Sequence, residues 1–268
     1  MTGTHYIIRG GLPGRERLRV LARTMRATTL ELLALTGVRS GMACLDVGCG
    51  GGDVSLELLR LVAPDGSVVG IDADATTVEL ARREAGAQGL QGIEFRVRDI
   101  TTADAQPEFD FAYARFLLSH VQRPDAAVAM IRRYLRRAGV LAVEDVDFTG
   151  HFCEPELPAF RRYVELYTRT AQRRGADPNL GPRLPGLLRA AGFSQVEMRV
   201  VQPAGFDGEV KLMAPLTMDN IGPAVIAAGF ATAAEIDRLV AELYAAARDG
   251  RTVMSIPRIV QAWGRRED

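Results

Sequence analysis

The segment Leu45-Asp46-Val47-Gly48-Cys49-Gly50-Gly51-Gly52-Asp53 decides the fold of this protein, because a short apolar run ends in it at a glycine-rich turn. The run Ala43–Val47 predicts a strand, and apolar residues at helical spacing follow Asp53. Glycines at such a turn let the backbone bend tightly and approach a ligand without a Cβ in the way. The amides of the loop and of the helix N-terminus are hydrogen-bond donors. The segment therefore predicts a ligand-binding strand–loop–helix unit.

Outward from this loop, short apolar runs alternate with helical patterns. Strands are predicted at Ala43–Val47, Ser67–Asp72, Ile93–Asp99, Phe109–Ala114, Val140–Val146, Phe193–Val201 and Ile256–Trp263. Helices are predicted at 15–36, from Asp53, at Ala75–Ala87, Pro124–Arg137, Leu157–Arg174 and Leu184–Ala191, with a mostly helical stretch over 203–252. This alternation indicates βαβ units and an α/β fold with a parallel sheet. Right-handed crossovers then place helices on both faces of the sheet.

A carboxylate at the end of the second strand indicates what the loop binds. Asp72 lies where a side chain can accept hydrogen bonds from both ribose hydroxyls of a nucleoside. The dinucleotide fingerprint would require glycine at position 53, which is Asp53 here. Carboxylates at Asp46 and Asp53 suit a ligand with positive charge, such as the ammonium and sulfonium of S-adenosylmethionine. A nicotinamide oxidoreductase is therefore disfavoured.

With these residues in place, the chain resembles the class I S-adenosylmethionine-dependent methyltransferases, especially the bacterial small-molecule group similar to the ubiquinone/menaquinone type. The resemblance is strong over residues 38–146 and loose elsewhere. Leu45–Gly52 resembles the motif E/D-x-G-x-G-x-G, with Asp46, Gly48, Gly50 and Gly52 in register. Gly70-Ile71-Asp72, Arg98-Asp99-Ile100 and Phe109–Arg115 resemble the next three motifs of the family.

The resemblance implies a Rossmann-like seven-stranded sheet in the order 3-2-1-4-5-7-6, with the last strand antiparallel. It implies that Asp72 holds the ribose, and that the Asp99 side chain and the amide of Ile100 address the adenine. The cofactor-binding residues expected from it are Tyr6, Arg17, Asp46, Gly48, Cys49, Gly50, Asp72, Ala73, Asp99, Ile100, Ala114 and Arg115. Read from the residues alone, Asp99 also fits a turn, Cys49 a packing role, and Arg115 an ion pair.

Three residues are candidates for catalysis. His120 follows the fourth strand at the ligand-binding edge, and its ordinary pKa suits proton transfer near neutrality. A helix cap or a packing role would explain it equally well. After the fifth strand, Asp145 and His151 are candidates to touch the substrate. Glu144, Asp145, Asp147 and His151 are potential metal ligands, but alternate strand residues point to opposite faces, and we predict no metal site.

Two flanking regions are expected to complete the site. Residues 1–37 are predicted to form an N-terminal arm and helix that cover the cofactor, with Tyr6 and Arg17 as contacts; in similar methyltransferases an arginine there meets the cofactor carboxylate. An exposed arm is the alternative. Residues 38–268 are predicted to form the methyltransferase domain, with helical lid elements at about 150–192 and 203–252. The lid would exclude water from an apolar acceptor pocket, or would pack on the core or form a dimer face.

Composition narrows the partners. Lys and Arg together number 33, as do Asp and Glu, so no net positive charge attracts nucleic acid. Three cysteines make no disulfide framework or zinc pattern, and the N-terminus has no apolar signal core, so a cytoplasmic protein is expected. No apolar stretch reaches the roughly 20 residues of a membrane span. An arginine-rich helix at 157–174 favours a homodimer.

These observations predict an S-adenosylmethionine-dependent methyltransferase that acts on a small organic acceptor, such as a secondary metabolite or a quinone-like molecule. Methyl transfer would proceed mainly by positioning, with possible help from a general base. The main alternative is an enzyme that binds the same cofactor but catalyses a cyclisation or isomerisation. A protein that only binds partners through a relic pocket is disfavoured by the intact set of glycines and aspartates.

Overall fold

The computed structural model describes residues 11–101 and 106–267, with side chains from Gly14 onward. Seven strands form the main sheet: β1 (Ala43–Val47), β2 (Ser67–Asp72), β3 (Ile93–Val97), β4 (Phe109–Arg115), β5 (Leu135–Asp147), β7 (Phe193–Val201) and β10 (Arg258–Arg266). Their order is β3-β2-β1-β4-β5-β10-β7. The first five strands are parallel, and β10 is antiparallel to both of its neighbours. This confirms the predicted order and the predicted antiparallel last strand.

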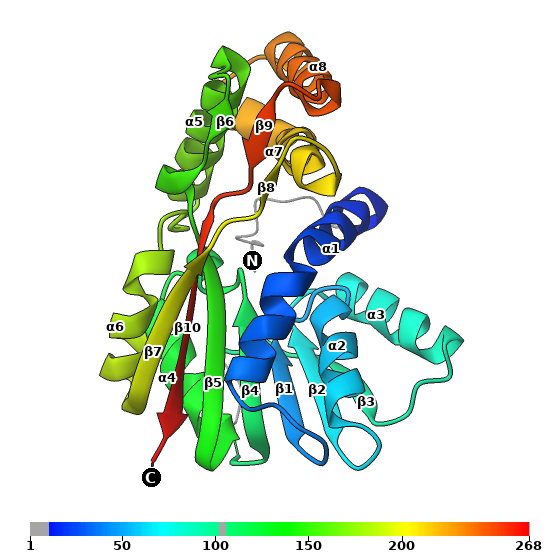
Figure 1. The fold of residues 1–268 in the computed structure, drawn as a ribbon, viewed down its shortest axis with the longest axis vertical. Helices are drawn as coiled ribbons and strands as arrows, with labels where there is room; N and C mark the ends of the chain where they lie inside the picture. The colour runs from blue at the N-terminus through cyan, green and yellow to red at the C-terminus, as the bar shows by residue number, and fades with distance from the viewer. Residues whose placement is uncertain (1–10, 102–105, 268) are drawn as a thin grey trace.

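Helices cover both faces of the sheet (Figure 1). They are α1 (Gly11–Leu35), α2 (Asp53–Val62), α3 (Ala75–Ala87), α4 (Pro124–Tyr134) and α6 (Leu184–Ala190), with short 3-10 helices η1 (Leu118–His120), η2 (Phe148–Gly150) and η3 (Gly181–Arg183). Strand alternation divides the core between the faces. Phe111 and Tyr113 of β4 pack with α1 and α2, whereas Ala112 and Ala114 pack with α4 and α6. A strand buried on both sides explains why β4 and β5 are apolar almost throughout.

Some element boundaries differ from those expected from the sequence. β5 begins at Leu135, before the predicted start at Val140, and α4 ends correspondingly early, because buried Leu135 pairs with Phe109. The last strand runs to Arg266 instead of Trp263. Its extension is fixed by pairing with the neighbouring strands and not by an apolar pattern.

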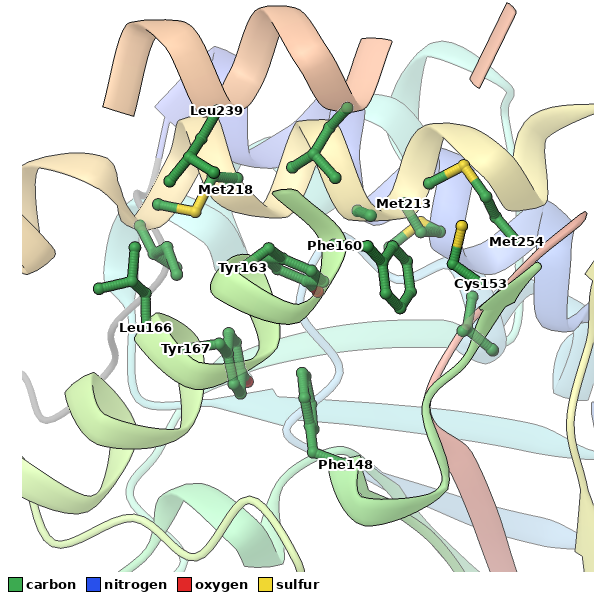
Figure 2. Close-up of a cluster of buried hydrophobic side chains, with 14 of the residues drawn as sticks. Phe148, Cys153, Phe160, Tyr163, Leu166, Tyr167, Met213, Met218, Leu239 and Met254 are labelled. Atoms are coloured by element: carbon green, nitrogen blue, oxygen red, sulfur yellow. The ribbon is translucent and has the colours of Figure 1, made fainter. Parts of the chain in front are cut away.

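The elements predicted to form the lid include α5 (Pro158–Arg173), α7 (Met213–Ala227) and α8 (Ala233–Arg248), together with η4 (Glu209–Leu212). The same region also holds a small three-stranded sheet in the order β6-β9-β8, formed by β6 (Cys153–Glu154), β8 (Ala204–Gly205) and β9 (Val253–Ser255), which the sequence did not suggest. These elements gather beyond the carboxyl ends of the parallel strands (Figure 1). Their core combines aromatic and methionine side chains with leucine, isoleucine, valine and alanine side chains (Figure 2). Among the described residues, no helix combines the length and apolarity required to cross a membrane.

Candidate active site

The glycine loop between β1 and α2 has a backbone that other residues would adopt only with strain. Gly48, Gly50 and Gly52 have φ of 71°, 52° and 82°, in the left-handed region that favours glycine. The amides of Gly48 and Cys49 donate to the carbonyl of Ile71 at 2.8 and 3.0 Å. The loop is thus fastened to the end of β2. Cys49 is buried, and burial raises its thiol pKa, which fits a packing role.

Asp72 ends β2 directly beside this loop. Its Oδ2 accepts a hydrogen bond from the Gly50 amide at 3.0 Å, and its Oδ1 accepts one from the Asp74 amide at 2.9 Å. A carboxylate oxygen has two lone pairs, so each oxygen of Asp72 retains one for a ligand. Burial raises the pKa of Asp72, while the two amide bonds oppose the shift. Ala73 follows, exposed at the rim.

Asp99 and Ile100 lie just beyond the end of β3. Oδ1 of Asp99 accepts the amide of Thr101 at 2.8 Å and the hydroxyl of Thr101 at 2.7 Å. This is the turn role that the sequence left open, and it fixes the carboxylate at the same sheet edge as Asp72. Asp99 is exposed and therefore reachable by a ligand, whereas the Ile100 side chain is buried.

The two carboxylates that flank the glycine loop have different environments. Asp46 is 3% exposed and accepts the hydroxyl of Ser55 at 2.6 Å. Burial raises the Asp46 pKa to about 6, although the Ser55 bond and the charge of Arg115 oppose the shift. Asp53 instead pairs with Arg15 of α1 at 2.5 Å. The sequence argument treated Asp53 as open to a cationic ligand; Arg15 already balances its charge.

Arg15 lies directly beside the glycine loop, a contact that the sequence reasoning missed. Its guanidinium is 6% exposed and donates to Asp53 and to Glu84 of α3. It lies so close to Gly51 that an added Cβ would come within 2.5 Å of its Cζ. The arginine therefore joins α1 to the start of α2 and to α3. No sequence signal distinguishes it from the neighbouring arginines.

The segment after β4 reaches the same edge. Ala114 is buried, and the next residue, Arg115, contacts the hydroxyl of Thr29 in α1 at 3.3 Å. Phe116 has φ of 53°, which is unusual for a residue with a side chain and is typical of functional sites. Leu117 lies against Gly48, and η1 then presents His120. Burial, with the charge of Arg17, lowers the pKa of His120 to about 4.

The acidic residues in the last part of β5 do not converge. Glu144 accepts hydrogen bonds from Tyr113, Thr29 of α1 and Gln261 of β10. Asp145 accepts the amide of Ser119 at 2.9 Å, and Asp147 pairs with Arg258. Over 11–101 and 106–267, no three His, Cys, Asp or Glu side chains are grouped as metal ligands would be.

Asp145 is 1% exposed, and through Ser119 it holds η1, which carries His120. Burial raises the pKa of Asp145 to about 6, although bonds from Ser119 oppose the shift. This placement supports a positioning role for Asp145. Direct contact of Asp145 with a substrate stays a prediction.

His151 lies inside the aromatic core of the lid. Its Nε2 is 2.9 Å from the carbonyl of Ser255, so that nitrogen is the protonated one. The rings of Phe148, Phe160 and Tyr163 stand edge-on to the imidazole at 4.8 to 5.6 Å between centroids. Burial lowers the pKa of His151 to about 3 despite the bond to Ser255. A role at the substrate stays a prediction.

Of the two contacts predicted in the N-terminal arm, Tyr6 lies outside the described residues. Arg17 lies in α1 and is 8% exposed. Its Nε donates to the hydroxyl of Thr217 in α7 at 3.0 Å, which ties α1 to the lid. That bond joins residues far apart in the chain, so the sequence offered no sign of it.

These groups fit an adenosyl ligand. Ribose hydroxyls and the adenine amino group are donors, and the carboxylates of Asp72 and Asp99 are acceptors at neighbouring strand ends. The amides of the left-handed glycine loop lie between β1 and α2, where a methionine moiety would need donors. A Cβ built on Gly50 would meet only the Leu18 side chain, at 3.6 Å. Fold and site together define a nucleoside-binding Rossmann-like enzyme.

Comparison with known proteins gives the family. Residues 38–172, half of the chain, match the family model described as a methyltransferase domain. A 2-phytyl-1,4-naphtoquinone methyltransferase of Trichormus variabilis is 32% identical over 173 residues, covering 61% of this chain and 72% of that protein. An uncharacterised 37.1 kDa protein of a Streptomyces fradiae transposon is 33% identical over 175 residues. That match covers 65% of this chain and 48% of the transposon protein. The chain belongs to the class I S-adenosylmethionine-dependent methyltransferase family.

Solved structures confirm the fold. The 4+2 cyclase SpnF superposes with a TM-score of 0.56 at 22% identity, covering 91% of this chain and 82% of the other. A Haemonchus contortus phosphoethanolamine N-methyltransferase, solved with S-adenosylhomocysteine, gives a TM-score of 0.55 at 15% identity. The superposition covers 99% of this chain and 55% of that one. At these identities the likeness is one of fold alone.

Proposed function

We propose that this protein transfers a methyl group from S-adenosylmethionine to a small organic acceptor. The observation that carries the proposal is the 3.0 Å bond between the Gly50 amide and Asp72, which joins the glycine loop and a carboxylate acceptor in one site. Membership of the family supports the cofactor. When bound, S-adenosylmethionine supplies a methyl group on a positively charged sulfur that becomes a neutral leaving group.

The cofactor contacts follow the strand ends. Asp72 accepts the ribose hydroxyls, and the Asp99 side chain and the Ile100 amide address the adenine. The remaining contacts proposed for the cofactor, through backbone or side chain, are Tyr6, Asp46, Gly48, Cys49, Gly50, Ala73, Ala114 and Arg115. Arg17, which the sequence predicted as a cofactor contact, instead bonds Thr217 of α7. Arg115 lies close enough to Asp46 for the two charges to interact. Their charges would offset each other beside the methionine part of the cofactor, where an excess of positive charge would repel the sulfonium.

His120, Asp145 and His151 are the residues proposed for the acceptor side. His120 is neutral near pH 7 because its pKa is about 4, so it is free to take up a proton but is a weak base. Positioning of the acceptor therefore supplies most of the acceleration. Asp145 contributes by fixing the position of η1, the short helix that contains His120. His151 contributes by packing among the aromatic rings of the lid.

The proposed acceptor is a quinone-like aromatic molecule or a related secondary metabolite. The Trichormus relative, named for a phytyl naphtoquinone, supports an aromatic substrate, and so does the aromatic core of the lid. We further propose a cytoplasmic homodimer that does not act on nucleic acid, on the basis of the balanced charge and the arginine-rich α5.

Calorimetric titration with S-adenosylmethionine and S-adenosylhomocysteine tests the cofactor site. Asp72→Ala should weaken binding about 10- to 150-fold, the equivalent of losing a charged hydrogen bond worth about 1.5–3 kcal/mol. Asp74→Ala is the matched control, because Asp74 lies in the same loop and carries the same charge but caps α3. Equal losses in the two variants, or no binding by the unaltered chain, would contradict the proposal.

Release of S-adenosylhomocysteine separates methyl transfer from the alternative. The second candidate is a cyclisation or isomerisation, because such an enzyme would need the same cofactor site. A methyltransferase releases one S-adenosylhomocysteine for each product, whereas a cyclase that uses the cofactor only for its charge releases none. Naphthoquinols are the first acceptors to offer in this assay, which is read by chromatography of the spent cofactor.

A further inference from the structure

Arg17 differs from the other arginines of α1 in having no carboxylate partner within the described part of the chain. Its one bond there is the donation from Nε to Thr217 at 3.0 Å. Two residues earlier, Arg15 is equally buried but pairs with Asp53 and Glu84. A guanidinium has five N–H donors, and burying it beside a single neutral oxygen is costly. The site is therefore electrostatically incomplete without an anion.

A further polar group, the hydroxyl of Tyr163, joins the contact between Arg17 and Thr217. Tyr163 of α5 is 2% exposed and interacts with the hydroxyl of Thr217, so Arg17, Thr217 and Tyr163 form a chain across α1, α7 and α5. Burial raises the pKa of Tyr163 to about 12 even though Arg17 and Thr217 oppose the shift, so its hydroxyl remains a donor. Figure 2 shows Tyr163 beside Phe160 on α5, facing the methionines of α7.

This cluster adjoins the glycine loop. Leu18, the residue after Arg17, is the side chain that a Cβ on Gly50 would meet at 3.6 Å. Leu117, three residues before His120, lies at 3.0 Å from a Cβ built on Gly48. The positive charge of Arg17 helps to lower the pKa of His120. The cationic group thus lies near both the cofactor loop and α7.

We propose that Arg17, with Thr217 and Tyr163, binds the ionised oxygen of the acceptor, so that the acceptor is an acidic hydroxyl compound such as a phenol or an enol. This rests on the proposed function, because it names the substrate class of that same site. The three residues come from α1, α7 and α5, so an anion bound to them would lie beneath the lid helices. A cationic group within about 4–6 Å lowers the pKa of a hydroxyl by 1–3 units, which favours the form that attacks a methyl group.

The cofactor's own carboxylate is the other source of an anion for Arg17, and the experiment separates the two. The probe is 4-nitrophenol, whose phenolate absorbs at longer wavelength than the phenol, titrated in the presence and absence of saturating S-adenosylhomocysteine. The unaltered protein should lower the pKa of the bound probe by at least one unit, a tenfold preference for the phenolate. 4-Nitroanisole, which has no ionisable oxygen, is the matched uncharged probe.

Arg17→Met should abolish the preference for phenolate, change the affinity for S-adenosylhomocysteine less than threefold, and leave the weak binding of 4-nitroanisole intact. Arg23→Met is the control variant: it removes the same charge from an exposed position of α1, where Arg23 pairs with Glu209. Arg17→Lys, which keeps the charge, should retain part of the preference, and Tyr163→Phe should reduce it. If Arg17→Met does not fold, the phenolate preference of these two variants tests the proposal instead.

Two results would overturn the inference. One is a tenfold or larger loss of S-adenosylhomocysteine affinity in Arg17→Met with no change at the probe, which would assign Arg17 to the cofactor carboxylate. The other is an unaltered protein that binds S-adenosylhomocysteine but shows no preference for phenolate. Failure of the proposed function has a different signature, namely no binding of S-adenosylhomocysteine at all, and the titration without cofactor still reports on Arg17 in that case.

Discussion

The substitutions Gly51→Ala and Arg15→Ala should have non-additive effects on the free energy of unfolding. A Cβ on Gly51 would lie 2.5 Å from Cζ, 2.6 Å from Nη1 and 2.8 Å from Nε of Arg15. Non-bonded contacts of a Cβ are essentially never that short, so Gly51→Ala must displace the guanidinium and weaken its bonds with Asp53 and Glu84. Gly51 does not have a positive φ, so alanine adds no backbone strain of its own.

The size of the effect follows from the exposure of the partners. Breaking a fully buried ion pair costs about 3–5 kcal/mol. Asp53 and Glu84 are about a quarter exposed, at 24% and 28%, so water takes over part of the interaction. We therefore expect Gly51→Ala to destabilise the protein by about 1–2 kcal/mol. In an Arg15→Ala background the methyl group has room, and the same substitution should be neutral or stabilising by up to about 1 kcal/mol.

The double-mutant cycle is completed by urea unfolding, monitored by circular dichroism, of the unaltered protein, the two single variants and the double variant. The predicted coupling between Gly51 and Arg15 is about 1–3 kcal/mol, which is well above the roughly 0.5 kcal/mol scatter of independent sites. Additive effects would show that Arg15 does not rest on the loop as described, and would remove the reason for treating α1 as part of the cofactor site.

The remaining predictions concern a glycine pair and a histidine. Gly52→Ala should destabilise by roughly 2 kcal/mol or more, because φ is 82° and the new Cβ would lie 2.6 Å from the ring of Phe95. Gly86→Ala, in α3 with nothing within 4 Å, should instead stabilise by about 0.5–1 kcal/mol in the same urea assay; equal effects in the two would contradict the account of the loop. The pKa of His151 is about 3 in the folded state, below its ordinary value of 6.5, so its contribution to stability is complete above pH 6.5 and is lost as the pH falls towards 3. His151→Gln should therefore reduce the loss of stability between pH 7 and pH 4 by up to about 3 kcal/mol, measured by urea unfolding across that range. An unchanged pH profile would show that the imidazole takes up a proton as readily in the fold as in the unfolded chain.

The sequence was sufficient to predict features that depend on a local pattern of residues. The strand period and the turn glycines predicted the strands and a parallel sheet, and the resemblance to the methyltransferase family implied the strand order that the fold has. Because the ends of parallel strands share one edge, residues at those ends, Asp72 and Asp99, could be placed together without coordinates. Helix ends and strand starts were less determined, as Leu135 shows: its place in β5 comes from pairing with Phe109 and not from its own neighbours in the chain.

Only the tertiary structure decided which charges are balanced. The sequence presents Asp53 as a bare carboxylate at a helix start and Arg15 and Arg17 as similar arginines. In the fold, Arg15 pairs with Asp53, and Arg17 turns to Thr217, 200 positions away. His151, equally free to be catalytic by its sequence, is enclosed by aromatic rings. A local pattern fixes backbone conformation because it acts over a few residues, whereas charge balance and burial depend on segments brought together by packing.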